Sequence, residues 1–447
     1  MKEMDLTEGK IGKALLQFSI PFLLASILQA FYGAVDLFVV GQFSTSSGVS
    51  AVATGSQVMQ TLTGVILGIS TGTTILIGQY LGAKKQQQIA QTIGTAICIF
   101  TLFAVCLTIV MTLLTPTLAK VMHTPIEAME ETKQYIFICS LGIPFIIGYN
   151  AASGIFRGLG DSKTPLILVA IACAINVIGD LILVAVFHMG AAGAAIATSA
   201  SQGTSFLLAV IYLKKKGFSF PFHKKDIRLD TKKAKQIFRL GLPIALQDGL
   251  INISFLMVTA IINLMGLTAS ASVGVVEKII VFAMLPAQAF ASAVAVMTAQ
   301  NMGANKPQRA QKGLYTGISM ALVFGVSFFV YAQIDSSKLI GLFTKDSDVI
   351  ELSQLYLKSY SWDCVLICFL FLLNSFFSGC GRSIFPMIHS FIATFLVRIP
   401  GSYFLSKMQG ATLYEIGFAA PVATILSLII CFVYFKRGTW KKMSVAS

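Results

Sequence analysis

The sequence predicts an all-α polytopic membrane protein with twelve transmembrane helices in two six-helix bundles related by a pseudo-twofold axis along the membrane normal. The chain has 447 residues, of which 55% are hydrophobic and only 12% are charged, whereas soluble domains carry about 25% charged residues. Its apolar residues come in runs of about 20 or more, the length that spans a bilayer as a helix. A repeated motif, described below, divides the chain into two halves.

Twelve apolar stretches separated by polar segments are the predicted spans. In chain order they are Leu15–Val40, Val52–Tyr80, Ile89–Leu114, Thr132–Phe156, Pro165–Phe187, Gly193–Leu213, Ile237–Leu264, Ala269–Met297, Gly313–Tyr331, Leu352–Phe377, Phe385–Leu405 and Tyr414–Phe435. We therefore expect a multi-pass protein of the cell membrane whose main surroundings are the lipid bilayer.

The positive charge predicts the orientation of these spans. The formal net charge is +14, and the cations fall mainly in alternate loops. With the N-terminus inside, the inside segments hold 25 Lys and Arg residues and the outside segments hold six. Basic residues gather on the cytoplasmic side of membrane proteins, so both termini are expected in the cytoplasm. The charge then needs no nucleic-acid partner.

An internal repeat defines the domain organisation. The motif FRGLGDSKTPLI begins at Phe156 and FSGCGRSIFPMI begins 221 residues later at Phe377, while Gln79 and Gln300 open two similar segments at the same offset. We expect residues 1–222 to form an N-terminal six-helix half and residues 223–447 a C-terminal half, joined by a basic cytoplasmic linker, 214–239. Because six spans is an even number, both halves enter from the same side, with a transport path between them.

Two glycine motifs have structural interpretations. In FRGLGDSKTP the glycines are expected to end one helix and the proline to start the next. A phosphate-binding role is not supported, because no strand precedes the motif and the full fingerprint is absent. The segment from Gly68 to Gly72 fits a nucleophile-elbow pattern by letter, but it lies within a span, without a preceding strand or an evident His partner.

Polar residues within the spans of the first half are the main candidates for a site. Asp36 and Asp180 are the two acids inside these spans. Asp36 and Thr198 lie about 8 Å and Asp180 about 10 Å from the same membrane face at 1.5 Å per residue. Asn176 is one helical turn deeper than Asp180. Three helices thus place oxygen-bearing side chains at a similar depth in the membrane.

This set of groups has the chemistry of a coupling-ion site. Carboxylates, an amide and a hydroxyl suit a hard cation, and two neighbouring carboxylates would otherwise retain a proton because they repel. Either Na⁺ or H⁺ is therefore a possible occupant, with Na⁺ as the site's metal if sodium drives transport. The alternative is that these groups hydrogen-bond to one another and only hold the helices together.

The second half breaks the symmetry. Val258 stands opposite Asp36, and this half instead carries Asp248, Glu277 and Asp363 as a possible ion or substrate site. Lys278 and Arg398 are also within its spans. Structural ion pairing and ligand binding are both open for these residues. Met257, Met284, Phe255, Phe282 and Phe290 are candidates for a soft wall around an amphipathic cation.

The motifs QYLGAKK, FRGLGDSKTP and Val397-Arg398-Ile399-Pro400, in two six-span halves, resemble the multidrug and toxic compound extrusion (MATE) family, of the wider multidrug/oligosaccharidyl-lipid/polysaccharide exporter superfamily. The resemblance implies a secondary-active exporter, an antiporter rather than an enzyme, that exchanges hydrophobic organic cations for Na⁺ or H⁺ without another cofactor. In its DinF-like branch, Asp36, Asn176, Asp180 and Thr198 match positions that line the ion site. Asn150 matches a further polar position, but lies nearer the cytoplasmic end, where we expect a supporting role.

Two other functions are possible from the sequence. A flippase of a lipid-linked precursor belongs to the same superfamily, but it should line its cavity with several Arg or Lys to meet phosphates. A membrane enzyme or channel is the third class, and neither a catalytic constellation nor the two-half repeat favours it. The partners we expect are small amphipathic cations, and the protein is expected to act as a monomer.

Overall fold

The structure, a computed structural model, describes residues 4–408 and 410–441. In this part of the chain all regular structure is helical, and twelve helical segments are long and apolar enough to cross a membrane. The predicted fold class, an all-α protein with twelve spans, is confirmed. The outermost residues at both ends, to which the predicted location of the termini applies, lie outside the described residues.

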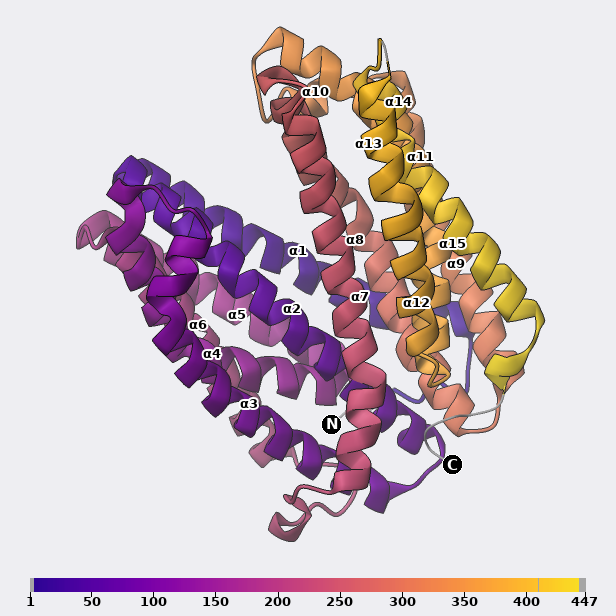
Figure 1. The fold of residues 1–447 in the computed structure, drawn as a ribbon. Helices are drawn as coiled ribbons and strands as arrows, with labels where there is room; N and C mark the ends of the chain where they lie inside the picture. Colours follow the sequence, from indigo (N-terminus) through magenta and orange to yellow (C-terminus); the bar gives the residue numbers. More distant parts are fainter. Residues whose placement is uncertain (1–3, 409, 442–447) are drawn as a thin grey trace. The chain divides into compact units, whose positions relative to one another are not determined.

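The helices of the first half follow one another with short connections (Figure 1). They are α1 Ile11–Phe43, α2 Ser46–Gly82, α3 Gln86–Val121, the 3₁₀ turn η1 Ile126–Ala128, α4 Met129–Gly158, α5 Lys163–Asp180 with its π-helical continuation η2 Leu181–Val186, and α6 Gly190–Lys216.

The second half has the same order with more interruptions. It comprises η3 Lys224–Asp226, α7 Thr231–Asn263, α8 Leu267–Gly303, α9 Pro307–Ile334, α10 Ser337–Ile340, α11 Ser347–Gly379, α12 Ile384–Ala393, the π-helical segment η4 Thr394–Arg398, α13 Ile399–Lys407, α14 Leu413–Gly417, α15 Ala419–Lys436 and η5 Thr439–Lys441. Three pieces thus form the eleventh span, α12, η4 and α13, and two form the twelfth.

The repeated motif forms the same connection in both halves. Helix α4 ends at Gly158 and α11 ends at Gly379, 221 residues later. Two residues further on, Gly160 has φ +85° and Gly381 has φ +83°, a left-handed conformation that glycine adopts without strain. The next helix begins within a few residues in both cases. The motif is therefore a helix–turn–helix connection, as the sequence predicts.

Contacts between helices group the chain into two units. One is built mainly from Leu24–Ala245, and the other from Leu6–Leu23 and the described residues from Leu246 onward. In the first unit α4 packs against α2, α3 and α6, and α5 packs against α6. In the second, α11 packs against α8, α9 and α15. One helix of each unit thus contacts most of its neighbours.

The two halves exchange the segments that lead into their first helices. Leu6 belongs to the second unit, where its N–H donates to Gln300 Oε1 at 2.9 Å and its carbonyl accepts from Arg309 Nε at 3.2 Å. Correspondingly, Arg228 belongs to the first unit, and its carbonyl accepts from Thr95 Oγ1 at 3.2 Å. The first parts of α1 and α7 are therefore anchored on the helices of the opposite half.

Close helix packing explains the presence of glycine at Gly68 and Gly72, the two glycines that fit the nucleophile-elbow pattern by letter. A Cβ placed on Gly68 would lie 2.5 Å from the Cα of Ala245, and one on Gly72 would lie 2.5 Å from the backbone nitrogen of Gly241. Small residues four apart let two membrane helices approach closely. The pattern therefore marks the crossing of α2 with the first part of α7.

Candidate functional site

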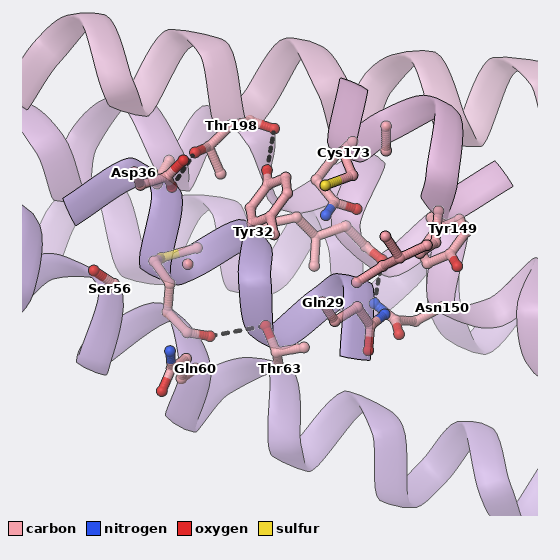
Figure 2. A pocket seen from close by; sticks show the side chains of 18 of the residues that line it. Gln29, Tyr32, Asp36, Ser56, Gln60, Thr63, Tyr149, Asn150, Cys173 and Thr198 are labelled. Atoms are coloured by element: carbon pink, nitrogen blue, oxygen red, sulfur yellow. Dashed lines mark hydrogen bonds between the residues drawn. The ribbon is translucent and has the colours of Figure 1, made fainter. Parts of the chain in front are cut away.

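The first unit encloses a cavity of about 330 Å³ between α1, α2, α4, α5 and α6 (Figure 2). Its aromatic lining comes from three tyrosines, Tyr32, Tyr135 and Tyr149. Its polar lining includes Gln29, Gln60 and Gln202. Among the described residues that line it, Asp36 is the only acid, and there is no Lys, Arg or His. The cavity is thus aromatic and polar, with a single acidic side chain among its described lining residues.

Asp36 lies at one end of this cavity (Figure 2). Its carboxyl is buried, with 4% of the residue exposed, and its Oδ2 accepts a hydrogen bond from Thr198 Oγ1 at 3.2 Å. One turn earlier on α1, the Tyr32 hydroxyl donates to the Thr198 carbonyl at 3.3 Å. These contacts hold the middle of α1 against α6.

Asp180 and Asn176 come from α5 and are fully buried. Both lie within side-chain interaction range of the Asp36 carboxyl. Yet Asp36 Oδ1, both carboxyl oxygens of Asp180 and both polar atoms of Asn176 have no hydrogen-bond partner in the described structure. The sequence-predicted residues Asp36, Asn176, Asp180 and Thr198 are therefore brought together, but most of their polar atoms are left unsatisfied.

Unsatisfied buried polar groups indicate a ligand, because native proteins leave very few of them. Two ionised carboxylates have no hydrogen to share, so a proton or a cation must lie between them for both to be stable. The surrounding oxygens come from carboxylates, an amide and a hydroxyl, which are ligands of hard cations. The residues present therefore fit either H⁺ or Na⁺.

Asn150 lies apart from this cluster. It lines the same cavity, but at the end near Gln29 and Tyr149 rather than near Asp36 (Figure 2). Its side-chain Nδ2 donates to the Ile146 carbonyl of its own helix at 2.8 Å, and its backbone carbonyl accepts from Ser70 at 2.8 Å. Asn150 thus shapes the cavity without touching the acids.

A π-helical segment begins directly after Asp180. Residues Leu181–Val186 widen the helical turn before α6 begins at Gly190. Such segments are rare and often mark functional sites. A second one, Thr394–Arg398, lies in the corresponding helix of the other half and ends at Arg398. The two halves therefore place opposite charges beside their π-helical turns.

Of the second-half candidates, Glu277 and Asp363 both lie within electrostatic range of Arg398. Asp363 and Arg398 line a small cavity of about 80 Å³ in the second unit. Glu277 lies outside that lining and accepts a hydrogen bond from Thr259 Oγ1 at 3.0 Å. Asp248 and Lys278 are exposed on the unit. In the described chain no ion pair within 4.0 Å joins any two of these five residues.

The predicted soft wall is only partly assembled. Phe255 and Met284 line the small cavity of the second unit. Met257 is 42% exposed and Phe282 is 43% exposed, while Phe290 is buried. The larger cavity of the first unit uses tyrosines instead. Its Tyr32 could have been found from the sequence, because it lies four residues before Asp36 and so on the same helix face.

Taken together, the membrane-length helices and the repeated connection define a multi-pass membrane protein of two related halves, with buried acids beside a cavity in one of them. The chain belongs to the MatE family, whose sequence model matches residues 21–182 and again 243–404. The second match begins and ends 222 residues after the first. It therefore reproduces the internal repeat.

Several relatives align over nearly the whole chain. The probable multidrug resistance proteins YpnP and YoeA of Bacillus subtilis are 29% and 26% identical, and cover 100% and 98% of this chain and 99% and 96% of their own. The multidrug export protein MepA of Staphylococcus aureus is 24% identical over 97% of this chain and 96% of its own. The chain is thus similar to these proteins throughout.

Solved structures share the fold. A transporter of the MOP superfamily from Pyrococcus furiosus superposes with a TM-score of 0.93 and 20% identity, covering 99% of both chains. An outward-facing multidrug resistance transporter of the MATE family gives a TM-score of 0.91 at 20% identity over 98% of both chains. At this identity the likeness concerns the fold.

Proposed function

We propose that the protein is a secondary-active multidrug exporter that exchanges hydrophobic organic cations for Na⁺ or H⁺ by alternating access. The class of transported compounds is suggested by the multidrug relatives that align along the full chain. The single observation that carries the coupling is the group of unpaired polar atoms on Asp36, Asp180 and Asn176 beside the cavity of the first unit.

The cavity supports a cationic substrate. Asp36 supplies its only negative charge among the described lining residues, and Tyr32, Tyr135 and Tyr149 offer ring faces. Organic cations bind aromatic faces and carboxylates favourably. A flippase for pyrophosphate-linked lipids needs Arg or Lys to meet the phosphates, and the described lining has none. The exporter is therefore the better-supported proposal.

Coupling follows from competition for one charge. A cation or proton between Asp36 and Asp180 removes their repulsion, which favours closer packing of α1 against α5 and α6. That movement narrows the cavity and withdraws the Asp36 charge from the substrate. Helix α1 contains Pro21, a residue at which helices bend. Ion binding and substrate binding thus oppose each other, and their coupling is reciprocal in free energy.

The proposal predicts gradient-driven transport in membrane vesicles. Purified protein reconstituted in liposomes should move an ethidium-like dye when an inward Na⁺ or H⁺ gradient is imposed. ATP should have no effect. Collapsing one gradient at a time identifies the coupling ion. Transport of a lipid-linked sugar and none of the dye would replace the exporter with the flippase.

We further propose that the protein acts as a monomer in the cell membrane, with both termini and the linker 214–239 in the cytoplasm. Single cysteines introduced near Ser46 and near Lys224, in a background without the eight native cysteines, test this orientation in intact cells. An impermeant thiol reagent should label the first position, and it should label the second only after the cells are permeabilised. The reverse pattern would contradict the orientation.

A further inference from the structure

The small cavity of the second unit is separate from the acids of the first. Its walls come from α7, α8, α11, α12, η4 and α15. Phe255, Met284 and Phe371 belong to its apolar lining. Its polar lining includes Gln247, Asn374, Ser390, Asp363 and Arg398.

Two pairs of polar side chains are hydrogen-bonded to each other. Gln247 Nε2 donates to Ser390 Oγ at 3.0 Å. Asn374 Oδ1 lies 2.9 Å from His389 Nε2, while the other ring nitrogen of His389, Nδ1, has no partner in the described structure. These four residues carry no formal charge when the imidazole is neutral. The two charged residues of the lining, Asp363 and Arg398, are different.

Arg398 retains capacity to bind an anion. A guanidinium has five N–H donors, and the structure gives it one hydrogen bond, from Nη2 to the Tyr360 hydroxyl at 3.2 Å. Its Cζ stacks 4.4 Å from the centre of the Phe255 ring. No carboxylate of the described chain lies within ion-pair distance of it. The group is thus oriented by two aromatic side chains, with donors left for a planar carboxylate.

Asp363 retains capacity to bind a cation. Only 4% of it is exposed, and its Oδ1 has no hydrogen-bond partner in the described structure. A buried charge without a partner is costly. Asp363 and Arg398 therefore present opposite charges to one cavity. They lie within electrostatic range of each other, but they form no ion pair within 4.0 Å in the described chain.

We propose that this cavity binds small zwitterions that carry an amino-carboxylate head group, such as α-amino acids. The carboxylate would meet Arg398, the ammonium would meet Asp363, and the apolar part would lie along Phe255 and Met284. One ligand then satisfies both charges, which neither an organic cation nor an organic anion can do. This site is distinct from the cation cavity of the first unit and does not depend on which ion drives transport.

Three matched probes test the proposal on the unmodified protein. L-phenylalanine is a zwitterion, its methyl ester is a cation and N-acetyl-L-phenylalanine is an anion. Isothermal titration of the detergent-purified protein should show phenylalanine binding about tenfold or more tightly than either derivative, because each derivative leaves one buried charge unpaired. Equal affinity for all three, or no binding of phenylalanine, overturns the proposal without any variant.

Variants then assign the two ends of the ligand. Arg398→Gln should bring the affinity for phenylalanine down to that for the methyl ester, and Asp363→Asn should bring it down to that for the N-acetyl compound. Arg398→Lys keeps the charge and should retain part of the affinity, which guards against loss of folding in the Gln variant. Arg437→Gln, an exposed arginine of the same unit, is the control and should bind as wild type.

The same measurement separates this proposal from the transport proposal. Asp36→Asn should lose gradient-driven export and keep phenylalanine binding. If export fails in the wild type while phenylalanine still binds through Arg398 and Asp363, only the transport proposal falls. If the pocket variants bind phenylalanine as tightly as wild type, the zwitterion site falls and the transport proposal is unaffected.

Discussion

Replacing Asp36 or Asp180 with asparagine is expected to abolish gradient-driven export while leaving the protein folded. Asparagine keeps the shape and one oxygen of each side chain but removes the charge that a cation or proton would neutralise. The oxygens concerned are buried and largely without hydrogen-bond partners in the described structure, so each variant leaves the site with one carboxylate instead of two. Dye efflux from energised cells at matched expression measures the effect.

Stability provides the accompanying readout. Removing an uncompensated buried charge eliminates its desolvation cost, so both variants should be as thermostable as wild type or more so. Asp335→Asn, which changes an exposed acid of the second unit, should export normally. Wild-type export rates in both Asp36→Asn and Asp180→Asn, with normal amounts in the membrane, would remove these residues from the coupling mechanism.

Much of the fold could be predicted because the length of the apolar stretches and the repeated motif are both visible in the amino-acid sequence without knowledge of tertiary contacts. The hairpin after Gly158 and its copy after Gly379 could be read from glycine and proline positions, since few residues adopt the conformation of Gly160. The grouping of Asp36 with Asp180 could be predicted from the helical rise per residue, which places both residues at a similar depth from the same membrane face.

Other features depend on tertiary packing and left little sign in the sequence. The π-helical turns beside Asp180 and Arg398 have no sequence motif that distinguishes them from α-helix. The exchange of Leu6–Leu23 between units depends on contacts almost 300 residues apart, such as that between Leu6 and Gln300. The approach of both Glu277 and Asp363 to Arg398 also follows from which helix faces meet, and spacing along the chain cannot give it.

Ion and substrate are expected to compete for the carboxylates of the first unit. Equilibrium binding of a quaternary-ammonium dye to detergent-purified protein, titrated with Na⁺ at fixed pH and with acid at fixed Na⁺, tests this directly. In wild type the dye affinity should fall as Na⁺ rises or as pH falls, because either cation neutralises the charge that Asp36 offers to the dye. A coupling of about 5- to 150-fold is typical of linked sites.

Asp36→Asn decides where that competition takes place. With one carboxylate already neutral, the variant should bind the dye more weakly, and its remaining affinity should be almost independent of the coupling ion. Asp335→Asn should retain the wild-type dependence. An equal ion dependence in wild type and Asp36→Asn would contradict the account and place the coupling site elsewhere, with Glu277 and Asp363 of the second unit as the next residues to change.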